Sequence, residues 1–309
     1  MRIVRDWTGL DKTARGATIA VGNFDGVHLG HQHVIDIARK AADAPLGVMT
    51  FEPHPREFFA PATPPFRLMN AETRANRLAK LGVDLLYELP FDARLAGLPP
   101  EAFARDVLAA GLGAAHVVVG ADFRFGAGRK GSADTLVEFG REMGFGVTIA
   151  ELLQGSEGAV SSTAIRAALT AGKPREAAAM LGHWHRIDGE VQKGAARGRD
   201  LGYPTANMSV EGLHLPRLGI YAVLVDVLTG PHAGSYKGAA SLGVRPMFGV
   251  NRPNLESFLF DFSGDLYGQH LSVGLIEFLR PEARFDGVEA LIEQMDADCA
   301  RAREILDAL

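Results

Sequence analysis

The stretch VGNFDGVHLGHQHVI, residues 21–35, holds three histidines, three glycines and an aspartate between two apolar patterns. The overlapping run ATIAVGNF, residues 17–24, predicts a strand, and an amphipathic pattern from about His31 predicts a helix. In an open α/β sheet, ligands bind where such a strand passes into its helix. The free N–H groups at the start of the helix favour an anion. We therefore expect His28 and His31 to face a bound phosphate at this turn.

The first half of the chain alternates strand and helix patterns. This alternation predicts right-handed crossovers and a parallel sheet with helices on both faces. Two more short helices are expected at residues 163–172 and 175–182. The strand candidates are residues 17–24, 46–51, 84–91, 115–123 and 146–153, and the helix candidates are residues 34–44, 72–82, 100–111 and 135–144.

The pattern changes near residue 183. From there on, glycine-punctuated strand patterns follow one another without helices, which predicts an antiparallel sheet closed into a small barrel. A long helix, Val288–Ala308, is expected at the end. We therefore expect two domains, residues 1–183 and 184–309. The strand candidates are residues 186–194, 219–230, 236–244, 255–262 and 271–279.

Composition excludes several functions for these 309 residues. A hydrophobic fraction of 47% and a charged fraction of 22% are typical of globular domains. With a net charge of −5, the chain lacks the excess of basic residues that is typical of proteins that bind nucleic acid or a membrane surface. The single cysteine, Cys299, allows no intrachain disulfide, and no stretch resembles a signal peptide or a membrane span. We expect a cytoplasmic protein; the oligomeric state is not readable from the sequence.

The residues GNFDGVHLGH, 22–31, resemble the nucleotidyltransferase signature G-x-F-D-G-x-H-x-G-H. Its H-x-G-H core recurs in enzymes that attack the α-phosphate of ATP and expel pyrophosphate. Negative charge builds on the α-phosphate oxygens in the transition state, so positioned donors lower the barrier. Gly26 and Gly30 are expected to let the backbone approach the phosphates. A turn with surface histidines is the structural alternative.

A second candidate phosphate-binding element is SSTAIR, residues 161–166. Ser161 or Ser162 is expected to cap a helix, and Arg166 to hold the β- and γ-phosphates of a nucleotide. An ordinary helix-capping motif is the alternative. The presence of H-x-G-H upstream favours the phosphate-binding interpretation over it.

Two loops also follow predicted strands, FEPHPREFF at 51–59 and GADFRFG at 120–126. His54 lies between two prolines, and Asp122 is placed to contact a nucleotide or the second substrate. For both loops a stiff turn is an equally good interpretation.

The loop GAARGRDLGYPTAN, residues 194–207, combines glycines, arginines and a P-T-A-N run. Its glycines, Gly194, Gly198 and Gly202, would let a flap fold over phosphates. The Thr205 hydroxyl and the Asn207 carbonyl are hard oxygen ligands that suit Mg²⁺ shared with ATP. A surface loop with a β-turn is the alternative.

The strand LESFLFDF, residues 255–262, carries a carboxylate among aromatic residues. By alternation, Glu256 shares a face with Phe258, Phe260 and Phe262. A carboxylate in such a place is a candidate general base. Leu255 and Leu259 make the opposite face apolar as well, so periodicity leaves open which face is the core. Asp261 and Asp200 fit the role less well.

These motifs, in this order, make the sequence similar to the bacterial bifunctional riboflavin kinase/FMN adenylyltransferases, the FAD synthetases. The resemblance implies a Rossmann-like α/β nucleotidyltransferase domain followed by a six-stranded Greek-key barrel with a C-terminal helix. It implies that the barrel makes FMN from riboflavin and ATP, and that the first domain transfers AMP to FMN, giving FAD and pyrophosphate.

The resemblance also implies roles for single residues. His28, His31 and Arg166 correspond to catalytic phosphate-binding residues, Thr205 and Asn207 to magnesium ligands, and Glu256 to the base for the ribityl hydroxyl. The positions expected to contact nucleotide or flavin are Gly22, Asn23, Phe24, Asp25, Gly26, Gly30, His54, Asp122, Ser161, Ser162, Thr163, Gly194, Gly198, Arg199, Gly202 and Pro204.

Three alternatives compete with this interpretation. H-x-G-H also occurs in class I aminoacyl-tRNA synthetases. A chain with a net charge of −5 and a barrel domain fits that class poorly. A degenerate flavin-binding relative would be expected to lose its charged groups, yet both histidines, Arg166 and Glu256 are present. A chain with one lost activity is the third, because the family usually has asparagine near Ser241 and threonine near Met247.

Overall fold

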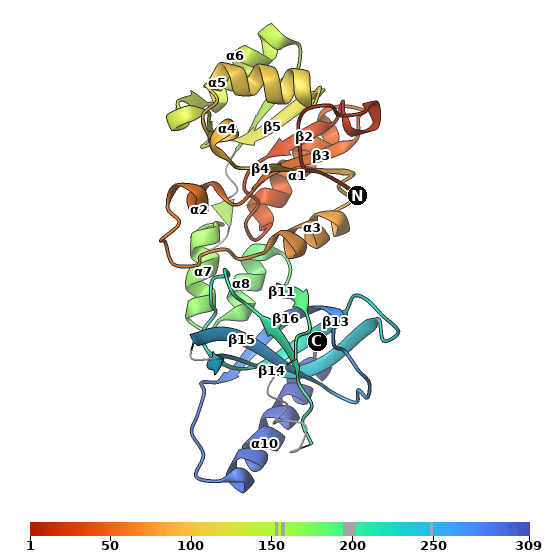
Figure 1. Cartoon of the computed structure of the whole chain (residues 1–309), viewed down its shortest axis with the longest axis vertical. Helices are drawn as coiled ribbons and strands as arrows, with labels where there is room; N and C mark the ends of the chain where they lie inside the picture. Colours follow the sequence, from red (N-terminus) through yellow and green to blue (C-terminus); the bar gives the residue numbers. More distant parts are fainter. Residues whose placement is uncertain (152–153, 156–157, 194–201, 248–249) are drawn as a thin grey trace. The chain divides into compact units, whose positions relative to one another are not determined.

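The computed structural model describes residues 1–151, 154–155, 158–193, 202–247 and 250–309, with side chains outside 152–159, 194–201 and 245–252. The chain forms two compact units (Figure 1). Unit 1 comprises Met1–Pro64 and Arg74–Val160, and unit 2 comprises Pro65–Thr73 and Ser161–Leu309.

Unit 1 is built on a six-stranded sheet in the order β1-β4-β3-β2-β5-β8, and every pair of neighbours is parallel, as the sequence predicts. From β2 the chain continues to β3 on one side and reaches β5 on the other. The carboxyl end of β2 therefore lies at the topological switch point, the usual place for a ligand. The strands are β1 (Arg2–Val4), β2 (Thr18–Val21), β3 (Leu46–Glu52), β4 (Leu85–Pro90), β5 (His116–Gly120) and β8 (Gly146–Ala150).

Helices cover both faces of this sheet. Ile19 and Val21 of β2 join one core cluster with Phe103 and Leu136, whereas Ala20 points to the opposite face, where α1 packs on β2 and β5. The helices are α1 (Leu29–Ala41), α2 (Pro55–Phe59), α3 (Ala71–Lys80), α4 (Ala93–Ala96), α5 (Pro100–Ala102), the π-helix η2 (Phe103–Gly111) and α6 (Ala133–Met143). Two 3₁₀ turns are η1 (Lys12–Ala14) and η3 (Ala127–Arg129). Two short hairpins are β6/β7 (Arg124–Phe125 with Gly131–Ser132) and β9/β10 (Gln154–Gly155 with Gly158–Ala159).

Several boundaries in unit 1 differ from the sequence prediction, and two of them bear on the site. The strand expected at 17–24 ends at Val21, so GNF belongs to the loop. The helix expected from about residue 31 begins at Leu29, because His28 already caps it. The short edge strand β1 was not predicted, since three residues carry too little pattern.

Unit 2 contains a six-stranded antiparallel sheet in the order β11-β16-β13-β14-β15-β12. Strands β13 to β15 are sequential neighbours and β16 returns beside β13, which is a Greek key. The Gln192 N–H donates to the Asn207 carbonyl at 2.8 Å and brings the two edges together. The expected barrel is confirmed. Its strands are β11 (His185–Glu190), β12 (Ala206–Ser209), β13 (Gly219–Val227), β14 (Gly234–Met247), β15 (Val250–Leu259) and β16 (His270–Arg280).

The last helix, α10 (Val288–Asp307), packs on the outside of the barrel. Its Ala302 and Leu306 form a second apolar cluster with Phe260 and Ile276. Arg280 at the end of β16 donates to both carboxylate oxygens of Asp298 at 2.7 to 3.0 Å. This nearly buried ion pair fixes the helix against the sheet.

Residues 65–73, which we name the strap, also belong to unit 2, although in sequence they follow α2 and end in the first turn of α3. Leu68 is fully buried against Ile165, Leu169 and Leu181 of the helices α7 (Ser162–Thr170) and α8 (Pro174–Leu181). The strap also reaches the barrel, since Asn70 Nδ2 donates to the Asp188 carbonyl at 2.9 Å.

Two candidate active sites

The loop after β2 has an unusual backbone. Phe24 and Val27 have φ values of 51° and 44°, in the left-handed region that side chains seldom adopt, and both are buried. Gly26 has a φ of 89°. Strain of this kind persists only where the surroundings enforce it, and it clusters at functional sites.

His28 is the N-cap of α1. Its Nδ1 accepts a hydrogen bond from the His31 backbone N–H at 3.3 Å. A neutral His28 therefore carries its proton on Nε2, which makes that atom a donor. The other N–H groups of the first turn of α1 point out of the same helix end.

His31 lies one turn further along α1, stacked on His28. Burial and the neighbouring His28 lower the pKa of His31 well below its ordinary 6.5, so its ring is neutral. Its Nδ1 is buried and has no hydrogen-bond partner within the described ranges. Such an unpaired polar atom at a helix N-terminus fits a site that completes its contacts with a ligand.

Gly30 makes room for the His28 ring. A Cβ at this position would lie 3.1 Å from Cε1 and 3.2 Å from Nδ1 of His28. The expectation that Gly30 serves close phosphate approach stays a prediction, and ring packing is a reason that the structure itself provides.

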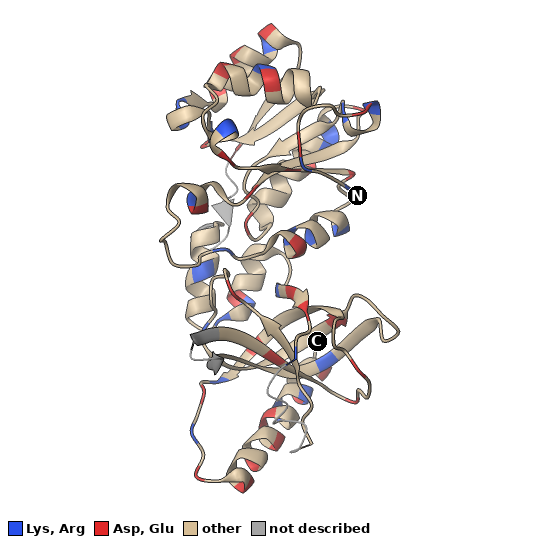
Figure 2. Ribbon diagram, viewed as in Figure 1, with Lys and Arg blue, Asp and Glu red and all other residues tan. Residues whose placement is uncertain are grey.

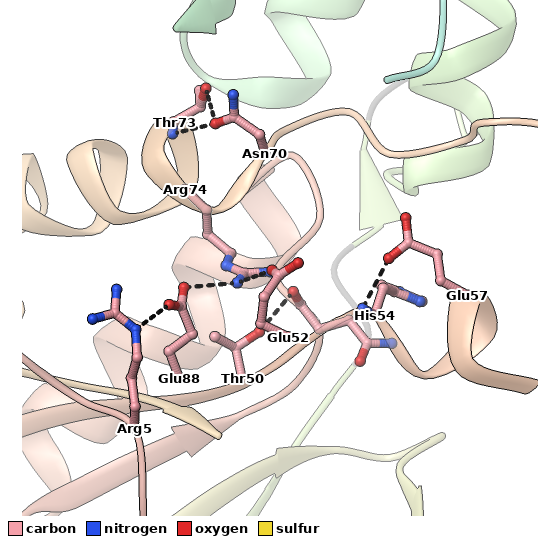
Figure 3. Close-up of polar contacts among 10 residues, drawn as sticks. Arg5, Thr50, Glu52, His54, Glu57, Asn70, Thr73, Arg74 and Glu88 are labelled. Atoms are coloured by element: carbon pink, nitrogen blue, oxygen red, sulfur yellow. Dashed lines mark hydrogen bonds and ion pairs between the residues drawn. The ribbon is translucent and has the colours of Figure 1, made fainter. Parts of the chain in front are cut away.

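Thr50 on β3 holds the loop that follows β2. This fully buried side chain donates from Oγ1 to the Asn23 carbonyl at 3.0 Å (Figure 3). Asn23 itself is exposed, whereas Asp25 is buried. Sequence reasoning missed Thr50, because one threonine in an apolar strand carries no recognisable signal.

A buried charge cluster lies at the ends of β3 and β4. Arg74 of α3 donates to Glu52 at 2.9 Å and to Glu88 at 3.1 Å, and Arg5 donates to Glu88 at 3.2 Å (Figure 3). Arg74 and Glu88 are 2% and 4% exposed, so the pairing compensates their desolvation. The sequence does not reveal these partners.

The loops after β3 and β5 differ in structure. His54 caps α2: its Nδ1 accepts from the Arg56 N–H at 3.0 Å, and Glu57 accepts from the His54 N–H at 3.0 Å (Figure 3). Asp122 is exposed just beyond β5, the neighbour of β2. Asp122 therefore follows the carboxyl end of a strand that is parallel to β2, at the same end of the sheet as the GNFDG loop. Ligand contacts of both residues stay predictions.

The SSTAIR motif starts α7 in unit 2. Ser161 is the N-cap, and its Oγ accepts from the Ala164 N–H at 3.2 Å, as expected. Ser162 and Thr163 are the first helical residues. Arg166 donates from Nε to the Phe66 carbonyl of the strap at 2.5 Å, a contact that sequence reasoning did not anticipate. Its predicted contact with phosphates is a proposal.

The second candidate site lies on the barrel, where β12 pairs with β15. Asn207 stands directly opposite Glu256, and Ser241 of β14 faces Glu256 from the other side. Asn207 Nδ2 donates to the Thr205 carbonyl at 3.1 Å and lies 3.4 Å from the Thr205 hydroxyl. Three of the predicted kinase residues are therefore brought together.

The structure decides which face of β15 is the core. Leu255 and Leu259 fill the barrel interior, so Glu256 lies on the outer face, where Phe258 packs under α10. The strand ends at Leu259, yet Phe260 still joins Phe258 in the cluster under α10, as expected; Phe262 packs against the interior cluster instead, so its expected placement on the face of Glu256 is wrong. Asp261 lies beyond the strand, where Arg303 donates to both of its carboxylate oxygens at 2.7 and 2.9 Å.

Several predicted residues fall outside the described parts of the chain. These are Gly194, Gly198, Arg199 and Asp200, together with the side chain of Met247. Gly202 and Pro204 are described and exposed.

Three wider properties of the described residues bear on function. No three His, Cys, Asp or Glu side chains among them gather into a metal-binding group. Within the same ranges, no helix has the length and hydropathy that a membrane span needs. Figure 2 shows acidic and basic residues interspersed along α6 and α10.

A histidine turn on a parallel sheet and a Thr-Asn-Glu cluster (Thr205, Asn207 and Glu256) on a barrel are features expected of a two-domain transferase that uses nucleotides. Residues 10–164 match the FAD synthetase family and residues 181–306 match the riboflavin kinase family. The chain is 40% identical to the bifunctional riboflavin kinase/FMN adenylyltransferase of Pseudomonas fluorescens, covering 99% of this chain and 98% of the relative. It is 37% identical to that of Escherichia coli K12, covering 98% and 97%.

A solved structure shares the whole fold. It is described as a macrolide-efflux protein from Streptococcus pneumoniae, with 31% identity, a TM-score of 0.80 and 96% coverage of both chains. The chain belongs to the family of bifunctional riboflavin kinase/FMN adenylyltransferases.

Proposed function

We propose that the turn around His28 and His31 and the cluster around Glu256 carry the two reactions of this bifunctional enzyme. Riboflavin is phosphorylated to FMN with ATP, and FMN is then adenylylated by a second ATP to give FAD and pyrophosphate. The observation that most supports this is the pairing of Asn207 with Glu256 across two strands, because it places a hard oxygen ligand beside a carboxylate.

In the adenylyl transfer, an oxygen of the FMN phosphate attacks the α-phosphorus of ATP and pyrophosphate leaves. Negative charge grows on the α-phosphate oxygens. The Nε2–H of His28, the ring of His31 and the N–H groups at the start of α1 are suited to stabilise it. Arg166, Ser161, Ser162 and Thr163 are proposed to bind the remaining phosphates.

In the kinase reaction, the ribityl hydroxyl attacks the γ-phosphorus of ATP and ADP leaves. Glu256 is proposed to accept the hydroxyl proton during the attack. The half-buried carboxylate is held by neighbours on the barrel surface, so it starts the reaction already positioned.

The oxygen atoms near Glu256 fit a magnesium ion. The Thr205 hydroxyl and the Asn207 amide carbonyl are uncharged, hard donors, which suit an ion that takes most of its ligands from nucleotide phosphates and water. When bound, Mg²⁺ neutralises phosphate charge. Thr205 and Asn207 would hold it, and the rest of the Thr-Asn-Glu cluster binds and orients the riboflavin hydroxyl.

We place the domain boundary at residue 183, with adenylyl transfer in residues 1–183 and the kinase in 184–309. The two family matches, residues 10–164 and 181–306, follow the same order along the chain, whereas in the structure residues 65–73 and 161–183 belong to unit 2. The proposed partners are the small molecules ATP, riboflavin and FMN, with no nucleic acid or membrane. A cytoplasmic location suits two reactions that both consume ATP.

The test is to separate the products by chromatography after incubation with riboflavin, ATP and Mg²⁺, and separately with FMN, ATP and Mg²⁺. Glu256→Gln keeps the shape of the side chain but removes the proton acceptor. It is expected to slow FMN formation by about a hundred- to ten-thousandfold. FAD formation from supplied FMN is expected to stay at the parent rate; a loss in both reactions would contradict separate sites.

A further inference from the structure

Asn254 joins the two candidate kinase residues through one side chain. It lies two positions before Glu256 on β15, so both side chains are on the same face of the strand. Its Nδ2 donates to Asn207 Oδ1 at 2.9 Å and to Glu256 Oε1 at 3.2 Å. Because an amide nitrogen carries two hydrogens, both bonds form at once.

The orientation of the neighbouring amide follows from this contact. Asn207 turns its Oδ1 toward Asn254 and its Nδ2 toward Thr205, where it donates to the main-chain carbonyl at 3.1 Å. The four residues thus form one chain of hydrogen bonds, from Thr205 through Asn207 and Asn254 to Glu256. A carbonyl oxygen has two lone pairs, so Asn207 Oδ1 keeps one for a cation.

We propose that Asn254 is a positioning residue for phosphoryl transfer, and this inference rests on the roles proposed above for Asn207 and Glu256. Its amide holds the proton acceptor and the ligand oxygen at a fixed separation. Both of those groups are acceptors, so without the amide they would face each other with no shared donor. The carboxylate and the ligand oxygen would then lose their common alignment toward the substrate.

A purely structural role for Asn254 fits the packing less well. The barrel interior at this strand is filled by Leu255 and Leu259, which are fully or almost fully buried. Asn254 is only partly buried on the opposite face. Replacing it therefore leaves the core of the barrel unchanged.

The central test is Asn254→Leu, which keeps the number and branching of side-chain heavy atoms but has no donor. We expect kcat for FMN formation to fall about ten- to hundredfold, the effect of losing a hydrogen bond to a charged group. The KM for riboflavin should change by less than about threefold, and FAD formation from supplied FMN should be unaffected. Ser235→Ala is the matched control, because it removes a hydrogen bond to Asp226 at the far end of the neighbouring strand β14.

Two further readouts separate positioning from stability. Calorimetric titration with ADP should show weaker binding in Mg²⁺ but unchanged binding in EDTA, because only the metal-dependent part involves Asn207. At saturating Mg²⁺ and ATP, Asn254→Leu combined with Glu256→Gln should lose less kcat than the product of the two single losses, because Asn254 acts in part through Glu256. If Asn254→Leu does not fold, Asn254→Asp keeps the shape, lacks the donors and should also lose kcat.

The outcomes distinguish this inference from the proposed function. Unchanged FMN formation in Glu256→Gln would overturn the assignment of the base, and with it this inference. A slow Glu256→Gln together with a fully active Asn254→Leu would overturn only the inference. Additive losses in the double variant would also overturn it, because Asn254 would then act independently of the carboxylate.

Discussion

The imidazole rings of His28 and His31 are stacked, with centroids 3.7 Å apart and an angle of 17° between their planes. Two rings this close cannot both be protonated at low cost, and burial lowers the pKa of His31 further. The pair is therefore a source of N–H donors rather than of fixed positive charge. Donors of this kind gain strength as negative charge develops on a phosphate.

Replacing His31 by alanine should slow FAD formation from FMN about a hundredfold or more, because one transition-state donor is lost. The measurement is the initial rate of FAD formation, with FMN formation from riboflavin as an internal standard. His33→Ala is the matched control, since it removes the third histidine of the same stretch. Equal effects of His31→Ala and His33→Ala would refute the assignment.

Thr50→Val should weaken adenylyl transfer while unit 1 stays folded. The substitution keeps the shape but removes the hydrogen bond to the Asn23 carbonyl, so the strained loop loses one support. We expect a loss of about three- to tenfold in kcat. Thr18→Val on the adjacent β2 is the control, because its buried Oγ1 has no partner in the described part of the chain. A loss in both variants would point to general damage of the sheet.

Arg74→Met should destabilise unit 1 by about 3 kcal/mol, because it leaves Glu88 and Glu52 without their shared cation. Urea unfolding followed by the fluorescence of the buried Trp7, in a Trp184→Phe background, measures this loss in unit 1. Adding Glu88→Gln should restore part of the stability. Arg39→Met, which removes an exposed pair with Asp36, should change the free energy of unfolding by less than about 1 kcal/mol.

His185 makes the stability of unit 2 depend on pH. Burial lowers its pKa to about 3 from an ordinary 6.5, so the unfolded chain binds the proton more tightly than the folded one. The stabilising contribution is complete above pH 6.5 and is lost as the pH falls from there toward 3. A single group gives a slope of about 1.4 kcal/mol per pH unit. Urea unfolding at several pH values, followed by Trp184 in a Trp7→Phe background, should show a shallower slope in His185→Leu than in the parent.

Tyr203→Phe should impair the kinase reaction selectively. The Tyr203 hydroxyl donates to Asp296 of α10, and its ring packs edge-on against Phe258, so α10 holds the residue that precedes Pro204 and Thr205. Phenylalanine keeps the packing and loses the hydrogen bond. We expect a rise of about three- to tenfold in the KM for ATP at limiting Mg²⁺. Tyr236→Phe, which removes a bond to the His232 carbonyl outside the site, should have no such effect.

Much of this architecture follows from local patterns. The strand and helix around residues 17–41, the Greek-key barrel and α10 each have a period that a short window reveals. The proximity of Asn207 and Glu256 is different, because it depends on the register of β12 against β15. The motifs suggest both residues, but only the fold places them opposite each other.

Other features carry no local signal. Arg74 and Glu88 are fourteen positions apart, and nothing in their neighbourhoods indicates that they meet in a buried cluster. In the sequence, Asn254 is indistinguishable from any other polar residue within a strand. Contacts of this kind depend on tertiary packing, which overrides the preferences of short segments.

The strap has a consequence for attempts to divide this enzyme. Residues 65–73 run from the loop after α2 into the first turn of α3, yet they are anchored on α7, α8 and the barrel. The two compact units are therefore interleaved along the amino-acid sequence. A single cut at residue 183 would leave the first fragment holding a segment whose Asn70 and Arg67 have lost their partners at Asp188 and Leu213. Exchange of halves between relatives would have to transplant the strap together with the barrel that receives it.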